Sequence, residues 1–145
     1  MTAMAAAGLL IVGLTACSSA DRGTSHADTL KAWRTHAQSS IDKMNDAMTW
    51  FEGAVKSSDY TGALDACRAF AGGVDSLQRQ LPTPDDGVTA VLKEAVNHFR
   101  DFDRQCATVN PQMTQDQANL VVSYRDKGIE QIKTAVDMMD RIEAQ

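Results

Sequence analysis

The chain has 145 residues, of which 43% are hydrophobic and 23% are charged, and its formal net charge is −5. This length suits one domain of ordinary size, and the composition excludes a chain that is disordered throughout, a collagen-like repeat and a polytopic membrane protein. An acidic chain also lacks the basic face that binds phosphates, so we expect no nucleic-acid partner.

An uncharged, apolar segment opens the chain. Residues 1–16 contain no charged side chain, and residues 5–14 (AAAGLLIVGL) form an unbroken apolar run. As a helix, these ten residues would span about 15 Å, half of a hydrocarbon core of about 30 Å. The run is too short for a transmembrane anchor and has the length of the apolar region of an export signal. We therefore predict a signal peptide over residues 1–16.

The apolar run ends in the sequence Leu14-Thr15-Ala16-Cys17, and Ser18 follows it. This sequence resembles the lipobox of bacterial lipoproteins, in which leucine, a small residue, and alanine or glycine precede a cysteine. The resemblance implies that Cys17 carries a diacylglyceryl thioether, that cleavage falls between Ala16 and Cys17, and that the new amine is acylated. Two or more acyl chains anchor a protein stably. We therefore expect a lipid-anchored protein on the outer face of a bacterial cytoplasmic membrane, or in the periplasm of a two-membrane envelope.

The start of this signal departs from the usual pattern, because an export signal normally carries lysine or arginine ahead of its apolar region. Residues 1–16 carry neither. Either the amino group of Met1 supplies the positive charge, or translation starts upstream; we favour the second interpretation.

Small and polar residues follow the lipobox, in the sequence SSADRGTSHA over residues 18–27. They show no apolar period, and ten such residues, if flexible, have a root-mean-square reach of about 17 Å. We predict that residues 17–27 comprise the lipidated cysteine and a flexible tether, and that the folded domain covers residues 28–145.

From residue 28 onward, apolar residues recur at steps of three and four, which indicates helices, and no stretch alternates with a period of two. The pattern predicts four helices, over residues 28–56, 59–81, 84–108 and 114–144. Because their connections are short, consecutive helices should run antiparallel. The sequence therefore predicts an all-α, up-down-up-down four-helix bundle.

Polar residues mark where these helices begin. The sequence Ser-Ser-Asp at 57–59 offers a side-chain acceptor to the first amides of the second helix. Thr83 is the predicted cap of the third helix, with Pro84 in its first turn. Thr114 and Gln117 fit a capping box at the start of the fourth helix.

If Cys17 carries lipid, Cys67 and Cys106 remain as a pair in an oxidising compartment, and we predict a disulfide between them. Their spacing matches no zinc motif. A simple hairpin between the second and third helices would place Cys67 opposite residues near 98, about 12 Å from Cys106 along the axis. That separation exceeds the roughly 7 Å between Cα atoms that a disulfide spans. The pairing therefore requires that the third helix slides toward the turn, or that the second helix bends at Gly72-Gly73.

One polar group on the third predicted helix has the residue types of a metal or acid–base site. Glu94 and His98 share a helical face, and Asp101 lies near them. Ferritin-type bundles use glutamate and histidine three residues apart on two helices, whereas this pair is four apart and occurs once. We interpret it as a surface pair.

The methionines of the first and last predicted helices could supply sulfur ligands. Met44 and Met48 lie one turn apart on the first helix, and Met138 and Met139 lie on the last. Soft sulfur ligands select Cu(I), but methionine also fills irregular cores. We favour core packing and expect no bound metal or cofactor. Trp50 lies off the apolar stripe and could mark a partner surface, although packing at the edge of the bundle is the interpretation we favour.

No motif for a catalytic nucleophile, a phosphate-binding loop or a dinucleotide site occurs in the sequence. We therefore expect a non-enzymatic module of the cell envelope that binds a protein or another envelope component through its helical faces. A bundle that binds a small ligand or a metal, such as copper or haem, is the alternative. An enzyme, or an accessory subunit of one, is the interpretation we favour least.

Overall fold

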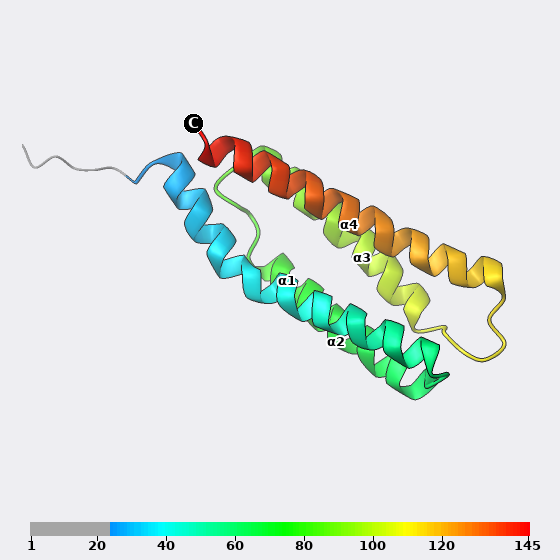
Figure 1. Cartoon of the computed structure of the whole chain (residues 1–145). Coiled ribbons are helices and arrows are strands. Elements are labelled where there is room, and N and C mark those ends of the chain that lie inside the picture. Colours follow the sequence, from blue (N-terminus) through cyan, green and yellow to red (C-terminus); the bar gives the residue numbers. More distant parts are fainter. Residues whose placement is uncertain (1–23) are drawn as a thin grey trace, which may run out of the picture.

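The computed structural model describes residues 24–145, which form four α-helices and contain no strand (Figure 1). The helices are α1 (His26–Lys56), α2 (Tyr60–Arg79), α3 (Asp86–Cys106) and α4 (Gln115–Glu143). This result confirms the predicted all-α, four-helix fold. The predicted signal peptide, Cys17 and the first part of the predicted tether lie outside the described residues.

Consecutive helices run antiparallel, and α4 closes the ring against α1 (Figure 1). The most extensive packing lies within two hairpins, formed by α1 with α2 and by α3 with α4, whereas α1 and α4 contact each other least. The hairpins diverge toward the end that carries the α1–α2 turn and the α3–α4 connection. The start of α1 and the C-terminus lie at the opposite end. Among the helices of residues 24–145, none has an apolar stretch long enough to cross a membrane.

Two clusters of buried side chains fill the bundle. The larger cluster contains Phe70 of α2, whose ring packs edge to face with those of Phe99 and Phe102. The distances between ring centroids are 5.2 Å to Phe99 and 5.1 Å to Phe102. The smaller cluster lies near the start of α1 and includes Leu30 of α1 and Met139 of α4. The apolar stripes of the sequence thus face one another across the bundle, as the helical period predicts.

The first helix begins inside the predicted tether. Ser25 caps α1: its hydroxyl accepts from the backbone N–H of Asp28 at 3.1 Å, and the Asp28 carboxylate accepts from the Ser25 backbone. This reciprocal pair satisfies two amides that would otherwise lack partners, so the helix starts at His26 rather than at residue 28. The predicted tether is therefore too long at its C-terminal end.

The third helix begins later than predicted. Its N-cap is Asp85, whose carboxylate accepts from the backbone N–H of Val88 at 2.9 Å. The predicted cap, Thr83, is buried, and its hydroxyl instead bonds to the hydroxyl of Thr89 and donates to the carbonyl of Asp85. Thr83 thus fastens the connection to α3 rather than capping the helix. The predicted caps at Asp59 and Thr114 are both present.

The contacts of α1 fix how α2 and α3 are offset. Trp33 donates from Nε1 to the carbonyl of Gln80, just after α2, at 2.7 Å. Nε2 of His26 lies 3.3 Å from Oδ2 of Asp85, just before α3. The end of α2 is therefore level with Trp33. The start of α3 is level with His26, which lies seven residues or about 10 Å nearer the start of α1. Residues 80–85 run along the bundle to span this offset (Figure 1).

The offset brings Cys67 of α2 beside Cys106 of α3. Their sulfur atoms lie at bonding distance, and their Cα atoms are 6.0 Å apart, which is within the range of disulfides. The sequence allowed two arrangements, a shift of the third helix toward the turn or a bend in the second helix. The structure shows the shift: α3 is displaced toward the α2–α3 connection. α2 continues without interruption through Gly72 and Gly73. The disulfide joins the two hairpins at the α2–α3 contact.

Candidate functional site

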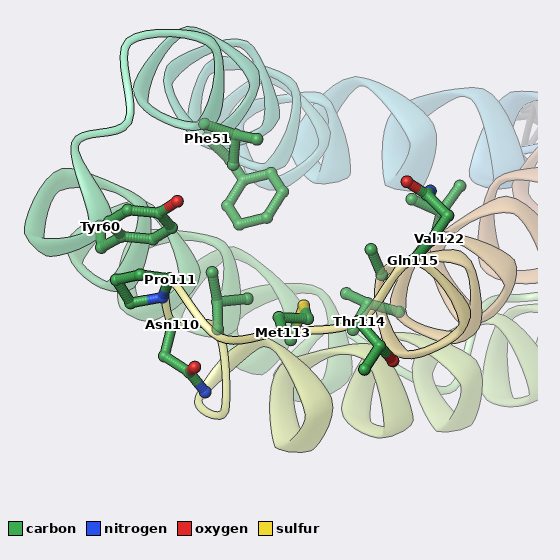
Figure 2. A pocket seen from close by; sticks show the side chains of 12 residues that line it. Phe51, Tyr60, Asn110, Pro111, Met113, Thr114, Gln115 and Val122 are labelled. Carbon is green, nitrogen blue, oxygen red and sulfur yellow. The ribbon is translucent and has the colours of Figure 1, made fainter.

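An apolar pocket of about 260 Å³ opens between the two hairpins, at the end of the bundle where they diverge (Figure 2). We call it the interhairpin pocket. The end of α1, the start of α2, the α3–α4 connection and the start of α4 each contribute to it. Its lining residues are Phe51, Val55, Tyr60, Val109, Asn110, Pro111, Met113, Thr114, Gln115, Ala118, Val121 and Val122.

The α1–α2 turn shapes one wall of the interhairpin pocket. Asp59 caps α2 by accepting from the backbone N–H of Gly62 at 2.9 Å, which places Tyr60 directly after the turn. Phe51 projects from the last turns of α1, and its ring packs edge to face with Phe102 at 6.0 Å. Figure 2 shows the Phe51 ring pointing into the pocket and the Tyr60 hydroxyl directed toward Phe51.

The α3–α4 connection shapes the opposite wall. The side-chain amide of Asn110 donates to the carbonyl of Thr108 at 2.8 Å, and its oxygen accepts from the backbone N–H of Gln112 at 2.8 Å. Thr114 and Gln117 then form the capping box that starts α4. These local hydrogen bonds hold the connection in a defined path across the pocket.

The interhairpin pocket offers apolar surface and little polar chemistry, because none of its lining side chains is charged. Asn110, Thr114 and Gln115 are exposed and make local hydrogen bonds; Gln115 donates to Asn119 at 2.9 Å. Tyr60 is half-buried, and its hydroxyl, which is not among the buried unpartnered atoms, has no protein hydrogen-bond partner within residues 24–145. The site can therefore hold an apolar group and form a hydrogen bond through one phenol.

Sequence reasoning did not find the interhairpin pocket. Val55 lies four residues after Phe51, at the step that predicts the buried face of the first helix, but it is 45% exposed and lines the pocket. Val122 lies beside the apolar face of the last helix, is 39% exposed, and lines the pocket from α4. An apolar residue beside the stripe, as Val122 is beside Val121, is the one signal that could have indicated a second apolar surface.

The residues Glu94, His98 and Asp101 are not gathered into one cluster. Glu94 is exposed, and Asp101 forms an ion pair with Arg104 one turn further along α3. Nδ1 of the half-buried His98 is buried without a hydrogen-bond partner in the described part of the chain. No group of three or more histidine, cysteine or acidic side chains could hold a metal among residues 24–145. His36, on α1, is exposed.

The four methionines considered as copper ligands are divided between the two core clusters. Met44 is buried in the larger cluster beside Gly73 of α2, and Met48 packs against the same cluster. Met139 is buried in the smaller cluster, with Met138 packed against it. The structure therefore does not bring the thioethers of α1 and α4 together.

Trp50 is 47% exposed, the largest exposed fraction among the large hydrophobic residues of the described chain. It borders a shallow surface groove between α1 and α2, next to Gly72 and Gly73. Trp50 thus lies outside the interhairpin pocket.

Three groups among residues 24–145 have shifted pKa values, and all lie outside the interhairpin pocket. A hydrogen bond to Asp140 is the main cause that raises the pKa of Arg34. The N–H of Val88 and then His26 lower the pKa of Asp85, against the effect of burial. Burial and then the charge of Asp75 raise the pKa of Asp103. Each of these groups belongs to a contact between two helices or to a helix cap.

No protein-family model, curated protein or solved structure matches this chain. The functional conclusion therefore depends on the residues and their geometry.

Proposed function

We propose that this protein is a lipid-anchored, extracytoplasmic binding module of a bacterial cell envelope, without catalytic activity, and that the interhairpin pocket is its binding site. The observation that carries the binding function is a 260 Å³ pocket lined only by uncharged side chains, between hairpins that diverge around it. The lipobox-like sequence that ends at Cys17 supports the anchor.

The composition of the pocket favours binding over catalysis. General acids, bases and nucleophiles require titratable groups whose pKa values suit the reaction. Tyrosine is the only titratable residue type in the pocket lining, whereas buried apolar surface is what drives association with a hydrophobic group.

The start of α1, which follows the proposed anchor in the sequence, and the pocket lie at opposite ends of the bundle. Phe51 follows His26 by 25 residues of α1, which is about 37 Å along the helix axis. Cys17 precedes the helix by only nine residues. A protein anchored through Cys17 would therefore present its pocket on the side remote from the lipid attachment.

The anchor is tested with a labelled fatty acid. Wild-type protein should incorporate the label and remain with the membrane fraction, and Cys17→Ala should lose both properties. Label that persists in Cys17→Ala would show that Cys17 is not the acylated residue.

The binding site is tested separately in the anchored protein. Ala118→Trp places a large side chain in the pocket, and Leu120→Trp places the same side chain at an exposed position of the same helix turn, outside the pocket lining. After affinity purification and mass spectrometry, the component that accompanies wild type should be lost from Ala118→Trp and retained by Leu120→Trp. A component retained equally by both variants would contradict the assignment of this pocket.

A further inference from the structure

We infer that the interhairpin pocket binds a small, uncharged molecule that has a compact hydrophobic body and one hydrogen-bonding group, and that the Tyr60 hydroxyl contacts this group. This ligand class deepens the binding function proposed above and depends on it.

The absence of charge in the pocket lining selects a neutral ligand. Transfer of an ion from water into an apolar site is costly unless a counter-charge or several hydrogen bonds replace its hydration. Phe51, Met113 and Val121 offer neither. A carboxylate, sulfonate or ammonium group would therefore have to remain outside the pocket, while a hydrocarbon group gains from entering it.

The volume of the pocket limits the size of the ligand. A cavity of about 150 Å³ holds benzene, and sites for drug-sized molecules begin at about 300 Å³. At about 260 Å³, the interhairpin pocket suits one or two rings or a short branched chain. An α-helix, about 10 Å across with its side chains, is too large to enter such a space.

Tyr60 gives the site its polar specificity. Its ring forms part of the apolar wall, and its hydroxyl is directed toward Phe51 (Figure 2). The hydroxyl is not among the buried unpartnered polar atoms of the described chain, so water reaches it in the empty pocket. A ligand with a donor or acceptor replaces that water and keeps the hydrogen bond, whereas a purely apolar ligand displaces the water and loses it. A ligand with one such group therefore satisfies the hydroxyl while its apolar part contacts Phe51.

A chain that begins at Cys17, as proposed for the mature protein, is too short for its first residue to reach this site. The nine residues from Cys17 to His26 span at most about 32 Å when fully extended, and Phe51 lies about 37 Å from His26 along α1. We therefore assign the pocket to a free molecule rather than to the segment around Cys17.

Three naphthalene compounds separate the contributions of charge and of the hydrogen bond. They share two fused rings: naphthalene has no polar group, 2-naphthol has one neutral hydroxyl, and 2-naphthalenesulfonate has one negative charge. Binding is measured by titration calorimetry on the full chain that carries Cys17→Ala. This variant has no acyl chain at residue 17 that could itself take up the hydrophobic compounds. We expect 2-naphthol to bind most tightly, naphthalene more weakly and the sulfonate weakest.

Two variants tie this binding to the pocket. Tyr60→Phe should lower the affinity for 2-naphthol by about two- to tenfold, the equivalent of one hydrogen bond, and should not lower the affinity for naphthalene. Ala118→Trp should lower the affinity for both compounds by about tenfold or more, whereas Leu120→Trp should leave both affinities unchanged. Circular dichroism verifies that each variant is folded, and the conservative Tyr60→Phe tests the site even if Ala118→Trp does not fold.

The ligand class is wrong if the sulfonate binds as tightly as 2-naphthol, if no compound binds, or if Tyr60→Phe weakens naphthalene as much as 2-naphthol. None of these results would change the outcome of the labelling experiment, in which Cys17→Ala is expected to lose the fatty-acid label. Failure of the ligand class and failure of the proposed lipid anchor are therefore distinguishable.

Discussion

The ring of Phe99 on α3 packs directly against the backbone of Gly128 on α4. A β-carbon at residue 128 would lie 2.9 Å from Cζ of this ring and closer still to Cδ1 and Cε1. Phe99 cannot move aside freely, because it is buried and packs edge to face with Phe70 at 5.2 Å. Glycine at 128 thus allows α3 and α4 to approach closely at the level of the larger core cluster.

Gly128→Ala should therefore destabilise the fold, although alanine is the better helix former. We expect the free energy of unfolding to fall by about 1–3 kcal/mol, the usual effect of overpacking. Gly72→Ala is the matched control, because nothing lies within 4 Å of a β-carbon at this exposed position of α2. It should stabilise the protein by about 0.5–1 kcal/mol. Urea denaturation of both variants measures these changes, and equal effects of the two substitutions would refute the close contact.

The four helices could be predicted from the sequence, because the period of apolar residues determines which segments bury one face. The offset between α2 and α3 could not be predicted. It depends on Trp33 binding the carbonyl of Gln80 and on His26 meeting Asp85, which are contacts between residues far apart in the sequence. The length of a connection limits such an offset without determining it.

The interhairpin pocket could not be predicted from the sequence for a related reason. Val55 continues the apolar step of α1, and this step is the same whether the residue contacts a neighbouring helix or lines an opening. It is 45% exposed and lines the pocket between the hairpins. Periodicity identifies the apolar face of a helix, but the tertiary packing decides how much of that face is covered.

The link between Cys67 and Cys106 should make a large contribution to stability. It encloses a loop of 39 residues, and the chain-entropy model gives about 4 kcal/mol for a loop of this length. We expect the double variant Cys67→Ala/Cys106→Ala to lose about this amount in chemical denaturation. Reduction of the unsubstituted pair should cause a similar loss, which controls for the effect of the substitutions on packing.

Thiol titration tests the link directly. The chain that carries Cys17→Ala should show no free sulfhydryl when it is unfolded without a reductant. Detection of two free thiols per chain under these conditions would exclude the disulfide in the isolated protein.

The cap of α3 should make stability depend on pH. The N–H of Val88 and then His26 lower the pKa of Asp85 below the ordinary aspartate value of about 3.9. Ionised Asp85 therefore stabilises the fold fully above that value, and this contribution is lost as the pH falls through the lower pKa of the folded state. Asp85→Asn keeps a side-chain acceptor for the cap but removes the charge.

We expect wild type to be more stable than Asp85→Asn by about 0.3–1 kcal/mol at pH 7, and this difference to shrink as the pH falls below about 4. Urea denaturation across this pH range measures it. Asp137→Asn, at an exposed position of α4 that forms no ion pair in the described chain, is the control and should give a small difference. A stability difference for Asp85→Asn that does not change with pH would contradict the role of the ionised cap.

The contact between α1 and α4, the slightest in the bundle, is bridged by Arg34. Its Nη1 lies 2.5 Å from Oδ1 of Asp140 and 3.5 Å from Oε1 of Glu143. The side chain is 32% exposed, so solvent screens the interaction, and surface pairs of this kind contribute about 1 kcal/mol or less. Arg34→Met keeps an apolar side chain at the position and removes the pair. We expect a loss of about 1 kcal/mol or less at low ionic strength and a smaller loss in 1 M salt, where the Debye length is about 3 Å.

Hydrogen exchange should show where that loss occurs. Because Arg34 joins two helices, Arg34→Met should speed the exchange of amides near Asp140 at the end of α4. Arg68→Met is the matched control, since Arg68 pairs with Asp65 within α2 and connects no second helix. Its substitution should leave exchange in α4 unchanged. If both variants alter exchange in α4 equally, then the bridge at Arg34 does not hold α1 and α4 together.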